Sequence, residues 1–128
     1  MNGPLVYVTT FTVKSGKIEE CRKKLNELVD LVEANEPRMI AFNVYFDDPG
    51  DKVSVVQVHP DAASMQFHLT VIAEHLYSAG EYLDQTVGVD IYGTPPDGLV
   101  EGDREWVAPD ALRFMPVHEA GFTRTSTR

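Results

Sequence analysis

Two histidines, His68 and His75, are the residues of this chain whose type and spacing best suit chemistry. A neutral imidazole has an ordinary pKa near 6.5, so it can take a proton from a weakly acidic hydroxyl at neutral pH. Their spacing of seven residues returns to nearly the same face of a continuous helix. We expect both at the border of its apolar stripe, facing a cavity; the alternative is two partly buried histidines bonded to backbone groups.

Other kinds of site have less support in the sequence. The four histidines, which include His59 and His118, form no short HxH, HxxxH or HxxE pair, so we expect no metal site. Cys21 falls on the apolar stripe of a helix, and no Gly-x-Ser-x-Gly turn is present, so nucleophilic catalysis is not expected. The glycines between 93 and 102 have neither the spacing nor the strand-to-helix context of a phosphate-binding loop, so they predict a linker.

The elements that must position these residues follow from hydrophobic periodicity and turn residues. Residues 5–13 predict a strand with two largely apolar faces, and Ser15 is the expected N-cap of an amphipathic helix that ends near Asn35. Residues 39–46 and 52–58 predict a hairpin around an Asp-Asp-Pro-Gly turn. Asp61 is the expected N-cap of a second helical region whose apolar line runs to Leu83, and 87–93 predicts a last strand.

This order predicts an α+β domain over residues 1–93, with a four-stranded sheet and two helices on one of its sides. The other side of the sheet is then bare, so we expect a homodimer through the sheet face and a cavity between the later helix and the sheet. Residues 94–128 predict a C-terminal arm. Its six large apolar side chains should make it dock on its own or on the partner subunit.

Composition limits the possible partners. The formal charge is −9 and no basic run is present, so we expect no nucleic acid partner. No apolar stretch approaches the ~20 residues that cross a bilayer, and the start Met-Asn-Gly-Pro lacks the features of a secretory signal. With one cysteine in 128 residues, these features favour a cytoplasmic protein without contact to membranes.

Three short motifs within residues 5–93 are similar to those of one known family. They are a strand-to-helix junction, a Glu-Pro pair before a strand, and a histidine on a helix that follows a strand end. In order they are Val-Lys-Ser-Gly-Lys at 13–17, Glu36-Pro37, and His-Pro-Asp at 59–61 with Phe-His-Leu at 67–69. In these motifs the chain resembles the antibiotic-biosynthesis monooxygenase family of dimeric α+β barrels, although Arg38 stands where glycine is usual.

The resemblance implies a ferredoxin-like βαββαβ sheet in a dimeric α+β barrel. It also implies a monooxygenase that oxidises a phenolic or quinol-type aromatic compound without metal or flavin, because the substrate's own anion donates an electron to oxygen. His68 or His75 would act as base, and Tyr45 or Asn43 would hydrogen-bond the oxyanion. The substrate-binding walls would come from Phe11, Phe42, Phe67, Leu76 and Thr9.

Departures from the family pattern define the alternative. His59 stands at the usual tryptophan position and Gln57 at the usual glutamate position. Thr9 and His68 stand where haem-degrading members carry asparagine and tryptophan, so haem oxygenation is disfavoured. Tyr45 and Asn43 also fit dimer-interface packing. The alternative function is therefore a non-catalytic, ligand-binding or stress-related protein that holds a small apolar ligand in the same barrel.

Overall fold

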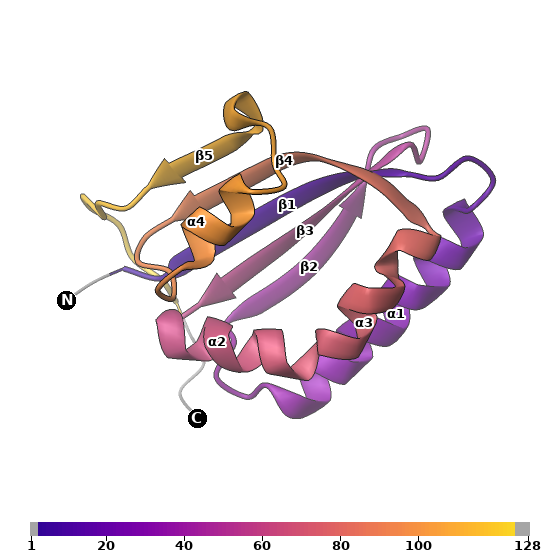
Figure 1. Cartoon of the computed structure of the whole chain (residues 1–128). Helices are drawn as coiled ribbons and strands as arrows, with labels where there is room; N and C mark the ends of the chain where they lie inside the picture. Colours follow the sequence, from indigo (N-terminus) through magenta and orange to yellow (C-terminus); the bar gives the residue numbers. More distant parts are fainter. Residues whose placement is uncertain (1–2, 125–128) are drawn as a thin grey trace.

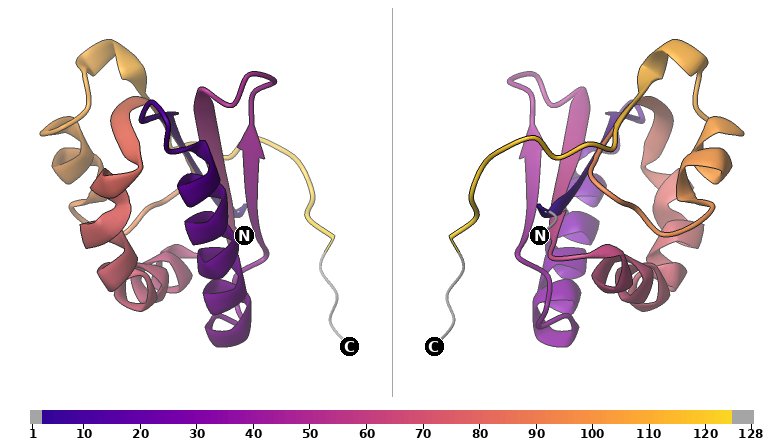
Figure 2. Two further views of the ribbon diagram at one scale, coloured as in Figure 1. Left: turned by 90° about the vertical axis from the view of Figure 1, so that its right-hand side faces the viewer. Right: turned by 90° about the vertical axis from the view of Figure 1, so that its left-hand side faces the viewer.

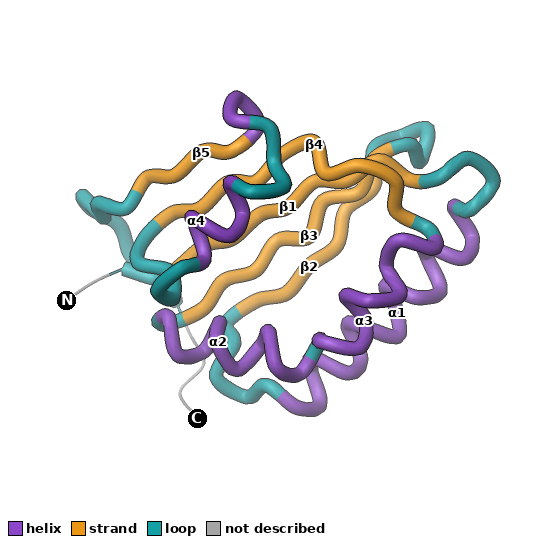
Figure 3. The backbone as a smooth tube through the Cα atoms, in the orientation of Figure 1, coloured by secondary structure: helices purple, strands orange, loops and turns teal. Residues whose placement is uncertain are grey.

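The computed structural model describes residues 3–124 and contains one five-stranded sheet with helices against one of its faces (Figures 1 and 3). Short 3₁₀ turns precede β4 and β5. Along the chain the elements are β1 (Leu5–Val13), α1 (Ile18–Asn35), β2 (Ala41–Phe46), β3 (Lys52–His59), α2 (Ala62–Val71), α3 (Ala73–Ser78), β4 (Leu83–Tyr92), α4 (Leu99–Arg104) and β5 (Leu112–Met115).

The strand order in the sheet is β2-β3-β1-β4-β5. β1 pairs antiparallel with β3 and β4, β2 and β3 form the predicted hairpin, and β5 adds to the edge parallel to β4. The first four strands and their helices have the ferredoxin-like βαββαβ order, so the predicted α+β fold class is confirmed. The fifth strand comes from the region predicted as the C-terminal arm, and it makes the sheet one strand wider than expected.

The second helical region is divided into two helices and does not extend as one helix to Leu83. α2 ends at Val71, Ile72 leaves helical geometry with φ −94° and ψ 6°, and α3 is a separate short helix. Ile72 is buried in the same apolar cluster as Tyr82, so the break lets the chain follow the sheet. Leu83, seven residues after Leu76, keeps the helical spacing, but it is the first residue of β4 and pairs with Val13. The last predicted strand therefore begins earlier in the sequence than Val87, where it was expected.

The predicted N-cap at Ser15 is wrong, whereas that at Asp61 is confirmed. A turn with Gly16 at φ +77° lies between Ser15 and α1, and Lys17 occupies the cap without a side-chain hydrogen bond. At α2 the Asp61 carboxylate accepts a hydrogen bond from the Ser64 backbone N–H at 3.0 Å. Asp61 therefore satisfies one of the free N–H groups at the start of α2.

Two apolar clusters fill the space between the helices and the sheet. One joins α1 to β3 and Tyr82 and includes Cys21, which is fully buried as expected. The other joins β1, β4 and Met65 of α2 to Val100 and Val107, so α4 covers the β1–β4 part of the sheet. Buried aliphatic side chains of this size each contribute roughly 1.5–3 kcal/mol. These clusters fill the region under α2 where the sequence predicted a cavity.

The opposite face of the sheet has no helix (Figure 2). Val8 and Val56 are neighbours on this face and remain partly exposed, as do Val6 and Val58. After β5 the chain leaves the sheet on this side, and residues 116–124 are exposed throughout. None of the helices in residues 3–124 combines the length and the apolar character needed to span a membrane.

Candidate functional site

A buried carboxylate and a buried imidazole form the centre of the candidate site. Glu36 is the C-cap of α1, where Pro37 prevents the helix from continuing, and its side chain turns toward the interior. His68 lies on the inner side of α2 with no exposed surface. Glu36 Oε2 and His68 Nδ1 are 2.7 Å apart, a short hydrogen bond between groups 32 positions apart in the sequence.

Burial shifts the pKa values of the two groups toward their neutral forms. It raises the pKa of Glu36 from 4.5 to about 7 and lowers that of His68 from 6.5 to about 4. Below pH 7 the protonated Glu36 Oε2 therefore donates to His68 Nδ1, and the ring hydrogen is on Nε2. Above pH 7 His68 Nδ1–H donates to the Glu36 carboxylate, and Nε2 carries a free lone pair.

A second buried histidine lies beside this pair. The rings of His59 and His68 are 5.6 Å apart, and both nitrogens of His59 have partners. His59 Nδ1 is 2.8 Å from Ser64 Oγ, and His59 Nε2 is 3.0 Å from Gln57 Oε1. An amide oxygen can only accept, so Nε2–H donates to Gln57 and the Ser64 hydroxyl donates to Nδ1. Burial and the neighbouring His68 lower the pKa of His59 to about 4, which keeps it neutral.

Two atoms of the Glu36–His68 pair have no hydrogen-bond partner. They are Glu36 Oε1 and His68 Nε2, the two buried side-chain polar atoms of residues 3–124 in this condition. A buried polar atom without a partner costs about 1–3 kcal/mol, so such an atom in a native fold calls for a functional or ligand-based explanation. The unpartnered Nε2 is the nitrogen from which His68 can exchange a proton with a ligand.

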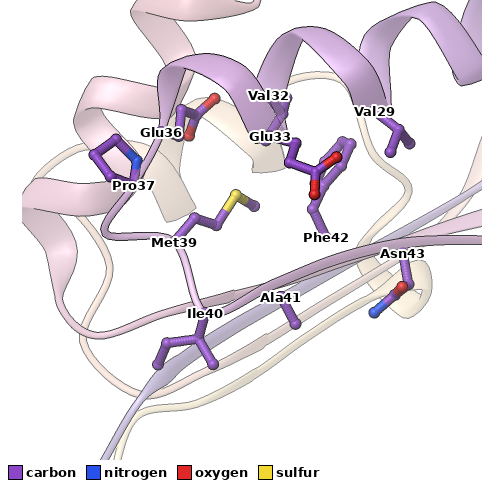
Figure 4. A pocket seen from close by; sticks show the side chains of 10 residues that line it. All are labelled: Val29, Val32, Glu33, Glu36, Pro37, Met39, Ile40, Ala41, Phe42 and Asn43. Atoms are coloured by element: carbon purple, nitrogen blue, oxygen red, sulfur yellow. The ribbon is translucent and has the colours of Figure 1, made fainter. Parts of the chain in front are cut away.

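A groove of about 460 Å³ lies between the C-terminal end of α1 and β2, and Glu36 is part of its wall. Figure 4 shows Met39 and Phe42 between the helix and the strand, with Asn43 on the opposite side of the strand. Phe42 connects the groove to the histidine, since its ring centre is 5.4 Å from that of His68. A ligand in this groove would lie against Phe42, one side chain away from His68.

A further stretch of about 350 Å³ continues this groove along β2 toward Arg22 and Phe46. The two stretches share Val29, Phe42 and Asn43. We call their combined length the edge groove. It runs beside the outer strand of the sheet, not under α2 as the sequence suggested.

Four of the sequence-predicted site residues share the helix-facing side of the sheet. Thr9 and Phe11 lie on the face of β1 that the helices cover, and Phe42 lies on the same face of the sheet in β2. His68 packs on this face from α2 and contacts Phe42. The Phe42–His68 pair is thus a contact between a predicted wall residue and a predicted base.

The other five do not lie on this face of the sheet, although Asn43 lines the edge groove from the other side of β2. Asn43 and Tyr45 point to the helix-free face of the sheet, opposite Phe42, as strand parity predicted. His75 lies on α3, beyond the break at Ile72, so it does not share a helix face with His68 as the spacing of seven residues predicted. Phe67 and Leu76 are 51% and 57% exposed, so they face solvent and do not line the interior.

Glu36, His59, Gln57 and Ser64 were not among the predicted site residues. His59 and Gln57 could have been recognised from the sequence, because they alternate in step with Val53 and Val55 and so lie on the buried face of β3. Glu36 was harder to recognise as a buried residue, since a glutamate at a helix end is usually solvated. Within residues 3–124 no three His, Cys, Asp or Glu side chains are grouped in a way that could hold a metal ion.

Comparisons with known proteins support the fold. No family model matches the sequence, and no curated protein matches it. The crystal structure of MupZ from Pseudomonas fluorescens matches 97% of this chain and 91% of that chain, with a TM-score of 0.72 and 19% identity. A crystal structure described as antibiotic biosynthesis monooxygenase matches 72% of this chain and 99% of that one, with a TM-score of 0.61 and 18% identity.

The structure of Rv0793 from Mycobacterium tuberculosis has the same fold, with a TM-score of 0.63 over 75% of this chain and 99% of that chain at 13% identity. The fold expected from the resemblance is therefore the one these solved structures share. At such identities the likeness concerns the fold, while chemistry has to be argued from the site.

Proposed function

We propose that this protein is a monooxygenase that acts without a bound cofactor on a small phenolic or quinol-type aromatic compound, with His68 as the base. The observation that carries the proposal is the buried Glu36–His68 pair, in which Nε2 of His68 has no partner. The fold shared with an antibiotic biosynthesis monooxygenase favours this reaction class over others that use a buried base.

In the proposed reaction His68 Nε2 takes the proton of the substrate hydroxyl. The resulting anion gives one electron to O₂, and the radical pair combines into a peroxide anion at a ring carbon that carries a hydrogen. This anion takes back the proton held by His68 and becomes a hydroperoxide. Loss of water then leaves a carbonyl at that carbon, so one oxygen atom is in the product and the other in water. Glu36 orients the imidazole and determines when its Nε2 lone pair is free.

The edge groove supplies an apolar place for the aromatic body of such a substrate. Phe42 and Met39 form dry walls, and exclusion of water strengthens each hydrogen bond made to the anion. The wall includes the carboxylates of Glu33 and Glu36 and no Lys or Arg side chain in its larger stretch, which suits an uncharged substrate. The phenolic substrate class rests on this chemistry and on the fold.

A second copy of the chain is the proposed partner for the helix-free face of the sheet. Val6, Val8, Val56 and Val58 form a continuous apolar area there, and they remain partly exposed although the arm after β5 lies beside Val6. An open apolar sheet face of this kind is normally shielded by another layer. A homodimer would provide that layer for both copies at once.

Oxygen consumption with a panel of hydroquinones, naphthols and anthrones tests the function. The wild type should consume oxygen with at least one of them, and His68→Ala should lower kcat by about 10²–10⁴-fold. Thr70→Ala, an exposed position on the same helix, is the control and should retain activity. His75→Ala should have little effect, because His75 lies beyond the helix break. Absence of oxygen uptake with every compound, or an active His68→Ala protein, would refute the proposal.

The complete burial of the reactive atoms favours the second candidate, a protein that binds a small apolar ligand without catalysis. Glu36 is 5% exposed and His68 is fully buried, so a ligand has to displace Phe42 to reach Nε2. If this candidate is correct, naphthols bind with a saturable quenching of the protein's fluorescence while no oxygen is consumed. Binding would then also persist in His68→Ala.

A further inference from the structure

The chain after β5 forms an exposed arm, residues 116–124, which meets its own subunit only beside the start of β1. His118 lies against Gly3, and the arm borders a shallow pocket with Pro4, Val6 and Tyr92. Val117 and Phe122 are 81% and 80% exposed. Two large apolar side chains exposed to this degree would gain stability from burial against another surface. The arm departs from the sheet on its helix-free side and extends outward (Figure 2). Its extended course and its exposed apolar side chains are typical of a segment that is ordered by a partner.

The opposite edge of the sheet is also incomplete. β2 is the last strand of the order β2-β3-β1-β4-β5, so one side of its backbone has no strand partner in the described part of the chain. An open edge strand is a template for a further extended segment. The edge groove lies directly beside it, lined by α1 and by Phe42. A strand added at β2 could place alternate side chains in this groove.

We propose that the arm of one copy lies along β2 of a second copy and closes its edge groove. This inference rests on the proposed dimer and makes the proposed substrate site a shared one. The arm begins at the β5 edge, four strand spacings or about 19 Å from β2 of its own sheet. In a face-to-face dimer each arm emerges on the side where the partner stands, so the partner's β2 is the accessible edge.

The length of the arm fits this place. Nine extended residues, 116–124, span about 30 Å, whereas the six residues of β2 span about 20 Å. The arm therefore covers the whole strand with a few residues left for the crossing between subunits. Pro116 at its start and Gly121 at φ +145° provide the bends that such a crossing needs.

One pair of opposite charges could support this contact. Glu119 and Arg124 cancel within residues 116–124, so the arm is neutral as a whole, with its positive charge near its end. The larger stretch of the edge groove carries the exposed carboxylate of Glu33 and no Lys or Arg side chain. Arg124 would be attracted to Glu33 of a second copy.

Photo-crosslinking identifies what the arm contacts. We would replace Phe122 by p-benzoylphenylalanine, mix this protein with wild type that carries a heavy-isotope label, and locate the crosslinked peptides by mass spectrometry. The expected product joins the arm to residues 39–46 of the labelled copy. The matched control carries the same photoreactive residue at Tyr77, which is 92% exposed on α3 and should give no such product.

A charge reversal at Arg124 tests whether this side chain contributes to the contact. Arg124→Glu in the photoreactive protein should lower the yield of the product severalfold, and added salt should act in the same direction. Crosslinks within one copy, or to any other segment of the second copy, would overturn the inference. So would a yield that the Tyr77 control equals. Because no substrate is present, these results do not depend on whether the protein is a monooxygenase.

Discussion

His68 and Glu36 are 32 positions apart in the sequence, yet each affects the protonation of the other through their hydrogen bond. In water the imidazole would be half protonated near pH 6.5 and the carboxyl would be ionised. In the protein the order is reversed, because burial raises the pKa of Glu36 to about 7 and lowers that of His68 to about 4. The pair is therefore a neutral acid and a neutral base that share one hydrogen bond.

Glu36→Gln tests this reversal through stability. Because the folded-state pKa of Glu36 is raised above its unfolded value of 4.5, its contribution to stability is complete below pH 4.5 and is lost as pH rises through about 7. The free energy of unfolding of Glu36→Gln relative to wild type should therefore increase between pH 5 and 8. We expect on the order of 1–2 kcal/mol, allowing for screening by the open groove.

Urea unfolding at a series of pH values measures this difference, and the two histidines cancel in it because both proteins retain them. The exposed Glu33→Gln, one helical turn earlier, is the control and should follow the wild-type curve. A difference between Glu36→Gln and wild type that does not change with pH would show that the carboxyl is not perturbed.

The same ionisation predicts a pH dependence of turnover. Above pH 7 the Glu36 carboxylate accepts from Nδ1–H and leaves the lone pair on Nε2, so kcat of an oxidised substrate should rise through about pH 7 and then level off. Glu36→Gln should lose this step. A wild-type profile that is flat between pH 6 and 8 would separate Glu36 from catalysis.

At the scale of elements, α4 is attached to the sheet by a buried polar contact as well as by apolar packing. Tyr7 O–H donates to Asp103 Oδ2 at 2.7 Å, and both residues are buried. Burial raises the pKa values of both groups, most strongly for Tyr7. The bond thus ties β1 to a helix 96 positions later and helps close the β1–β4 end of the core.

Tyr7→Phe should destabilise the protein by about 1–3 kcal/mol, because it leaves the Asp103 carboxyl buried without its donor. Urea denaturation monitored by circular dichroism would measure the loss. The double variant Tyr7→Phe/Asp103→Leu should recover most of it, since both polar partners are then apolar. A Tyr7→Phe protein as stable as wild type would mean that Asp103 reaches water when its partner is removed.

At the scale of the whole molecule, the helix-free face predicts self-association. Val56 lies at its centre, opposite Val8 on β1 and Asn43 on β2. Val56→Lys places a charge in the proposed interface and should convert a dimer to a monomer in sedimentation velocity, without loss of the folded core. Glu27→Lys, on the exposed side of α1, introduces the same residue and should remain dimeric. A monomeric wild type would exclude the proposed dimer.

Many features of this fold follow from local sequence patterns. Alternation assigned the two faces of β1 and β2, the Asp-Asp-Pro-Gly turn placed the hairpin, and Asp61 marked the start of α2. These features depend on neighbours a few residues away, which the sequence displays directly. The resemblance to a known family then supplied the fold class, which the solved structures with the same fold support.

The candidate site was decided by tertiary structure. Ile72, where the helix breaks, is buried in one apolar cluster with α1 and Tyr82, and the break removed His75 from the face of His68. Glu36 looks like a solvated helix end until the fold brings α2 over it and encloses both side chains. A pKa shift by desolvation requires that enclosure, and enclosure is made by segments that are distant in sequence. The sequence alone thus determined the strands, turns and a candidate base, whereas the partner and the protonation state of that base came from burial.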